Sequence, residues 1–131
     1  MKKKGREFSF ARTHRNLADV LKDRELASLG DAYINFAYSL ALSNKTGQPV
    51  GIKVKGEALA EALKKTGLRE YAPSRMTRHK LADAAEALIV YAWLQGSLTL
   101  VETASILERA DDLVDGLGSL LKVIAKRVKF S

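Results

Sequence analysis

Apolar residues recur at intervals of three to four along most of this sequence, as they do on one side of an amphipathic helix. Only two prolines and nine glycines interrupt the pattern, so we expect an all-α fold with little room for strands. The first long helix is predicted over residues 24–43 and ends in the segment 44–47. Its expected inward side is formed by Leu26, Leu29, Tyr33, Phe36, Ala37 and Leu40.

The middle of the chain predicts a loop followed by a short helix. Residues 48–56 hold one proline and two glycines, so we expect them to form a connector. Residues 57–66 are predicted to form an amphipathic helix that stops at Gly67, since glycine suits the left-handed conformation that caps a helix.

A second long helix is expected to begin after a cap at Ser74 or Thr77 and to run to Gln95, before a glycine. Between residues 84 and 94 its only polar side chain, apart from a tyrosine hydroxyl and an indole N–H, is Glu86. A helix that is apolar on all sides belongs inside a bundle.

Two more helices are predicted in the C-terminal third. Thr99 and Glu102 have the spacing of a capping box and start a helix that runs to about Ala110. The last helix is amphipathic, and its expected inward residues are Leu113, Leu117, Leu120, Leu121 and Ile124.

The composition fits a single domain over residues 1–131 with one hydrophobic core. The absence of cysteine excludes disulfides, thiolate zinc sites and cysteine nucleophiles, and it suits a reducing compartment, so we expect a cytoplasmic protein. The basic residues 1–4 are not followed by the apolar run of a secretory signal. Residues 87–101, the longest charge-free apolar stretch, fall short of the roughly 20 residues of a membrane span. We therefore expect a soluble protein with no membrane partner.

The net charge of +7 favours an anionic partner, and the placement of the charges is more informative than their sum. The 22 Lys and Arg residues are segregated, because residues 25–44 and 81–108 contain none of them. A basic surface around an apolar interior is also found in thermostable proteins that have no such partner. Charge alone therefore identifies no ligand.

Three carboxylates stand out, because Asp31, Asp83 and Glu86 lie in the two cation-free segments. A buried carboxylate must be paired, protonated or bound to a cation. Asp83 and Glu86 are three residues apart, and Asp31 and Asn35 are four apart, so each pair shares a helix face. Two facing helices would bring these oxygens together, and an oxygen-only set suits Mg²⁺, or Mn²⁺.

The alternative is that the acids lie on a solvated edge. Asp83 could then pair with Lys80, and Asp31 could point to water.

The sequence resembles the ribonuclease III family in three segments. Residues 29–32, Leu-Gly-Asp-Ala, resemble the family's signature in a buried helix. Residues 83–96 are similar to its second acidic helix, and residues 54–71 are similar to the helix between them. The resemblance covers about residues 26–106, and two acidic helices in the right order are far more specific than one short motif.

This resemblance implies an all-helical bundle that forms a homodimer and hydrolyses double-stranded RNA with Mg²⁺, leaving staggered ends. By position, Asp31, Asp83 and Glu86 would be the catalytic metal ligands. Asn35, which shares a helix face with Asp31, would contact the ligands and not the metal itself. No protein nucleophile and no small-molecule cofactor are implied.

Two departures from the family pattern bear on activity. The family usually has a glutamate one helical turn before the signature aspartate, where this sequence has Ala27, and Glu25 points about 120° away. The connector 45–56 also lacks the family's additional glutamate. The compact branch called Mini-ribonuclease III similarly has a small residue at the first position and no appended RNA-binding domain, and ribosomal precursor RNA is its substrate class.

Cations that flank the acidic helices are the candidate contacts to RNA phosphates: Lys53, Lys55, Arg75, Arg78 and Lys80. Each could equally be an ordinary solvated side chain. His14 and His79 lie in polar surroundings, where we expect solvated histidines without a role. The aromatic residues Phe36, Tyr91 and Trp93 are expected in the core or in a dimer contact.

The sequence thus predicts a homodimeric, Mg²⁺-dependent endoribonuclease that acts on double-stranded or structured RNA, with ribosomal precursor RNA as the candidate substrate. One alternative is an RNA-binding dimer that keeps the fold with a degraded metal site. Another is a structural helical dimer that binds no nucleic acid.

Overall fold

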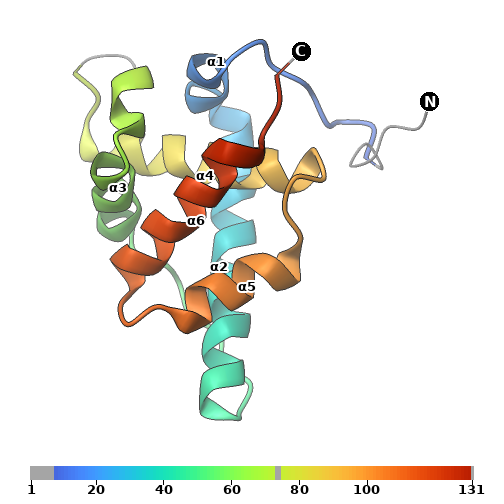
Figure 1. The fold of residues 1–131 in the computed structure, drawn as a ribbon, viewed down its shortest axis with the longest axis vertical. Helices are drawn as coiled ribbons and strands as arrows, with labels where there is room; N and C mark the ends of the chain where they lie inside the picture. Colours follow the sequence, from blue (N-terminus) through green and yellow to red (C-terminus); the bar gives the residue numbers. More distant parts are fainter. Residues whose placement is uncertain (1–7, 73–74, 131) are drawn as a thin grey trace.

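The computed structural model describes residues 8–72 and 75–130, and within these ranges it contains helices and no strand (Figure 1). The all-α prediction is confirmed. The elements are α1 (Leu17–Leu21), α2 (Arg24–Thr46), α3 (Gly56–Lys65), the 3₁₀ helix η1 (Leu68–Tyr71), α4 (Arg78–Leu94), α5 (Leu100–Arg109) and α6 (Leu113–Arg127).

Helix α4 is the centre of the bundle. It contacts α1, α2, α3 and α6, and every residue from Ala84 to Ala92 is buried, as the all-round apolar pattern predicts. Figure 1 shows α4 running across the long axis of α2, with α6 in front of it. No helix in the described ranges is both long and apolar enough to cross a membrane.

The crossing of α2 and α4 is unusually close at Gly30. A Cβ atom at this position would lie 2.1 Å from the carbonyl oxygen of Glu86 and 2.5 Å from its carbonyl carbon. Because both atoms belong to backbone, no rotamer change could make room. Glycine therefore lets the two helix backbones touch, and it places Asp31 beside Glu86.

The inward side predicted for α2 is partly wrong. Leu26, Tyr33 and Ala37 are buried as expected, but Leu29 is 37% exposed and Phe36 is 56% exposed. The helix instead places Gly30 against α4, because a residue without a side chain permits close helix packing. The buried residues that were not predicted are Ala27, Gly30, Ile34 and Ala41.

The predicted helix ends are largely confirmed. Thr77 caps α4, and Thr99 and Glu102 form a capping box at α5. Helix α2 runs three residues beyond the predicted end to a left-handed cap at Gly47. Ser74, the other candidate cap of α4, lies outside the described residues.

Helix α6 buries four of its five predicted inward residues, and the fifth, Leu113, is half-buried. Two short elements, α1 and η1, were not predicted. They are too short to show a helical period in the sequence.

We expect Gly30→Ala to destabilise the protein by about 1–3 kcal/mol, because the added methyl group must push α2 and α4 apart. Gly118→Ala is the matched control, since a Cβ there meets no atom within 4 Å, and it should stabilise α6 by up to about 1 kcal/mol. Urea unfolding of the two variants measures both effects. Equal effects of the two substitutions would contradict the close crossing.

Candidate active site

All three singled-out acids line one cavity. This acidic cavity has a volume of about 530 Å³ and lies between α2, α4 and the connector that leads into α3. Its charged and polar lining residues are Arg24, Ser28, Asp31, Lys53, His79, Asp83 and Glu86. Helices far apart in the chain thus bring Asp31 together with Asp83 and Glu86.

Among these three acids, Glu86 is the one that is buried, and its pKa is raised. Its side chain is buried, with only 7% of the residue exposed. Burial, a hydrogen bond with Asp31 and the negative charges of Asp31 and Asp83 together raise the pKa of Glu86 from its ordinary 4.5 to about 8, while the charge of Lys53 opposes the shift. Glu86 therefore holds a proton at neutral pH when no cation is bound.

Asn35 positions the Asp31 carboxylate. Its side-chain N–H donates to Asp31 Oδ1 at 3.3 Å, and its own oxygen accepts from the backbone N–H of Val54 at 2.7 Å. Since Val54 occupies the amide oxygen, Asn35 turns its donor side toward Asp31. Asn35 accordingly supports a carboxylate and does not add an oxygen to the cavity.

The connector is held along α2 by a repeated contact. Three polar residues of α2, each four positions after the last, hydrogen-bond alternate residues of the connector. The pairs are Asn35 with Val54, Ser39 with Ile52, and Ser43 with Val50. Four helical residues rise about 6 Å and two extended residues span roughly 6.6 Å, so the two repeats match. The match places Lys53 in the wall of the acidic cavity.

The other candidate RNA-binding cations occupy different surroundings. Arg75 and Lys80 line a second cavity beside the acidic one, and Arg78 lies 3.5 Å from Glu57. Lys55 is exposed at the cap of α3 and lines neither cavity. In the part of the chain that the structure describes, no ion pair joins Lys80 to Asp83.

The expectation of a solvated His14 is wrong. Its Nε2 lies 2.9 Å from Asp23 Oδ2, and its backbone N–H donates to the hydroxyl of Tyr91. Burial alone would raise the pKa of Asp23, but hydrogen bonds from Leu26 and His14 and the charge of Arg12 hold it below its ordinary value. His14 thus helps to fix the N-terminal cap of α2. His79 is exposed and lines the acidic cavity.

No fourth acid enters the cavity from the start of α2. Ala27 forms part of the wall, and Glu25 is bound at 2.9 Å by the guanidinium of Arg12. The expectation that Glu25 does not replace a glutamate at position 27 is thereby confirmed.

The donor set partly fits a divalent cation. Over residues 8–72 and 75–130, no group of three His, Cys, Asp or Glu side chains is assembled to hold a metal ion. Asp31 and Glu86 nevertheless interact directly. Mg²⁺ is commonly bound by one or two carboxylates together with waters and substrate phosphates. The site therefore fits a hydrated Mg²⁺ held by this pair, with Asp83 close enough to act on Glu86 through its charge.

A family model described as Ribonuclease III matches residues 24–128 of the chain. The match spans the acidic cavity and every helix except α1. A comparison with curated proteins gives no match.

We expect the stability of the cation-free protein to fall as the pH rises from about 4.5 to about 8. In this window Glu86 keeps its proton in the folded state and loses it in the unfolded state, which lowers the free energy of unfolding by up to about 1.4 kcal/mol per pH unit. Glu86→Gln cannot ionise, so its stability should change less over this window and exceed that of the parent above pH 8.

Urea unfolding in the presence of a chelator at pH 5 to 9 makes this measurement. Glu57→Gln is the control, because the Glu57 side chain is 74% exposed and its loss should leave the slope unchanged. A parent slope identical to that of Glu86→Gln would contradict the shifted pKa.

Proposed function

Because the chain belongs to the ribonuclease III family, we propose that it is a Mg²⁺-dependent endoribonuclease that hydrolyses phosphodiester bonds in double-stranded or structured RNA. The observation that supports this most directly is that Asp31, Asp83 and Glu86 line a single cavity. Without a cation, the pKa of Glu86 is raised by burial and by the neighbouring acids. An arrangement that is unfavourable for carboxylates alone is favourable around a divalent cation.

Asp31 and Glu86 are the proposed ligands, and Mn²⁺ could replace Mg²⁺. Bound there, the cation would polarise a phosphodiester and lower the pKa of a water molecule. Glu86 must lose its proton to bind a cation, so binding is coupled to proton release. Asn35 keeps the Asp31 carboxylate turned toward the cavity, and Asp83 adds negative charge to it.

The reaction is a hydrolysis without a protein nucleophile. A water oxygen forms a bond to phosphorus while the bond between phosphorus and the 3′ oxygen breaks. The leaving 3′ oxygen takes up a proton, which gives a 3′-hydroxyl and a 5′-phosphate.

The RNA backbone is held in this proposal by cations around the acids: Lys53, Lys55, Arg75, Arg78 and Lys80. Such contacts are largely independent of base sequence and weaken with salt. Ala27 is compatible with the Mini-ribonuclease III branch, and on that basis cytoplasmic ribosomal precursor RNA is the proposed substrate.

A homodimer is also proposed. Apolar side chains are exposed along α2 and the connector beside it, namely Leu29, Phe36, Val50 and Ile52. The hydroxyls of Ser39 and Ser43 accept from and donate to the backbone of Ile52 and Val50, which holds the connector against α2, so the two segments form one surface. A twofold dimer would bury this surface against its own copy.

A second candidate function is RNA binding without cleavage. It is favoured by the alanine at position 27, which lines the cavity where an acid would add a ligand. It is also favoured by a second finding: in the described ranges, no three His, Cys, Asp or Glu side chains are placed so that together they could hold a metal ion.

The purified protein should cleave duplex RNA in Mg²⁺ and be inactive in a chelator. Asp31→Asn and Glu86→Gln should each lower kcat by about 100-fold or more, because each loses several kcal/mol of charge stabilisation. Asn35→Ala should cost about tenfold, as expected for a residue that orients a ligand. A gel assay of single-turnover cleavage measures these rates.

Glu61→Gln removes an exposed acid on α3 and serves as the control with parent activity. Salt-sensitive RNA binding without cleavage in Mg²⁺ or Mn²⁺ would favour the non-catalytic candidate. Absence of both binding and cleavage would favour a structural dimer.

Light scattering after gel filtration should give a mass twice the 14.4 kDa of one chain. Phe36→Asp should shift the mass to that of a monomer, since it places a charge in the proposed apolar interface. Tyr71→Asp is the control, because Tyr71 is 55% exposed on η1, which contacts α1 and α3. A monomeric parent at about 100 µM would contradict the dimer.

A further inference from the structure

A second cavity, of about 320 Å³, lies at the start of α2 and α4. Its charged lining residues are the cations Lys22, Arg24, Arg75 and Lys80 and the acids Asp23 and Asp83. We call it the cationic cavity. Lys22 and Arg24 come from a region of the sequence that gave no signal for a site.

The negative charge of Asp23 is already neutralised inside the protein. Its carboxylate lies 3.2 Å from the guanidinium of Arg12 and 2.9 Å from the ring of His14. It also accepts the N–H of Leu26 as the cap of α2. Asp23 is therefore satisfied and contributes little negative potential to the cavity.

The cations, in contrast, have almost no acidic partners. Across the described part of the chain, the one ion pair made by the four cations joins Lys22 to Asp19 at 4.0 Å, the outer limit for such a contact. Arg24, Arg75 and Lys80 make none. Four cations around a single uncompensated carboxylate leave a net positive cavity.

The backbone at Arg75 is strained. Its φ angle is +63°, which is the left-handed region that residues with a side chain rarely adopt. Such a conformation typically costs about 1 kcal/mol or more and tends to persist at functional sites. Here the strained residue is one of the cations that line the cavity.

The cationic cavity adjoins the acidic cavity, because Arg24 and Asp83 line both. An anionic strand that enters the acidic cavity therefore lies next to the cations of the adjoining cavity, of which Arg24, Arg75 and Lys80 make no ion pair among the described residues. The ligand chemistry that matches both cavities is a chain of phosphodiesters, with one phosphate at the acids and a neighbouring phosphate at the cations.

We propose that the cationic cavity is a phosphate subsite, in which Lys22, Arg75 and Lys80 hold an RNA backbone phosphate adjacent to the one at the acids. This inference rests on the proposed function. It adds Lys22 to the residues that contact substrate, and it gives the strand a fixed position along the cavity.

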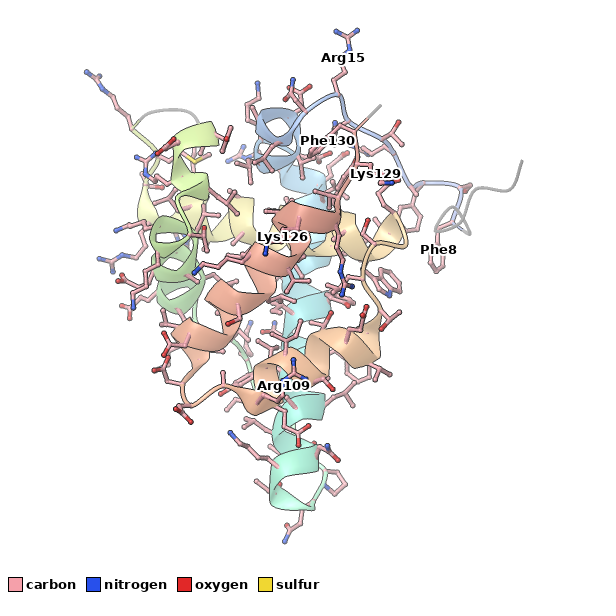
Figure 2. The ribbon with its side chains drawn as sticks, in the orientation of Figure 1. Phe8, Arg15, Arg109, Lys126, Lys129 and Phe130 are labelled. Atoms are coloured by element: carbon pink, nitrogen blue, oxygen red, sulfur yellow. The ribbon has the colours of Figure 1, made fainter. Side chains whose placement is uncertain are left out.

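The test compares two double variants that remove equal charge. Lys22→Gln with Lys80→Gln alters the cationic cavity, and Lys122→Gln with Lys126→Gln alters α6, which lines neither cavity and carries Lys126 on the face shown in Figure 2. Binding of a duplex RNA is measured in a chelator at several salt concentrations. The cavity variant should bind about tenfold more weakly, and its slope of log Kd against log salt should be smaller by about one, while the α6 variant keeps the parent slope.

Arg75→Gly separates a ligand role from a structural one. Glycine relieves the left-handed strain, so the free energy of unfolding should be unchanged or higher while RNA affinity falls. Lower stability together with unchanged affinity would overturn the assignment of Arg75.

The outcomes distinguish this inference from the proposed function. A parent that binds and cleaves RNA, with a cavity variant that matches it, would overturn the subsite alone. Equal losses in the cavity and α6 variants would overturn it too, because they would reflect net charge only. A parent that neither binds nor cleaves RNA would overturn the proposed function, and the subsite with it.

Discussion

The contact between the backbones of α2 and α4 at Gly30 is the constraint on which the site depends. No side chain separates the two helices there, since even a Cβ would lie 2.1 Å from the carbonyl oxygen of Glu86. Asp31 follows Gly30 in the chain, so the closeness of the helices fixes the closeness of the two carboxyl groups. Packing of the core and assembly of the acids are therefore one event, and a larger residue at position 30 would disturb both.

The acids stay together at a cost in free energy that the fold itself does little to offset. Among the described residues, neither α2 nor α4 supplies a cation from its buried face, and the charge of Lys53, on the connector, opposes the shift in the pKa of Glu86. The protein resolves the repulsion by leaving a proton on Glu86. A divalent cation that binds between Glu86 and Asp31 can displace this proton. The pair therefore supports the proposed metal chemistry more than either residue alone.

The sequence predicted what depends on neighbouring residues and missed much of what depends on distant ones. The capping box of Thr99 and Glu102 and the burial of α4 follow from local spacing. The prediction that Leu29 and Phe36 are buried was wrong, because a search for apolar periodicity favours large apolar residues. It gives no weight to small residues such as Gly30, which let two helices approach closely. The contact of Asn35 with Val54 and that of His14 with Asp23 arise only from the tertiary fold, as does the presence of Lys22 and Lys80 in one cavity.

The two adjoining cavities also resolve an electrostatic conflict in the proposed activity. A cluster of acids attracts a cation but repels the phosphates on which that cation would act. Because charges in water are screened over about 8 Å at physiological salt, a net charge of +7 spread over the surface does not remove this repulsion. Cations must lie beside the acids, and Lys53 and Arg24 meet that condition because both line the acidic cavity. In the sequence, the basic residues are separated from the segments 25–44 and 81–108 that carry the acids. This separation is compatible with an anionic substrate only because the fold places Arg24 and Lys53 in the lining of the acidic cavity.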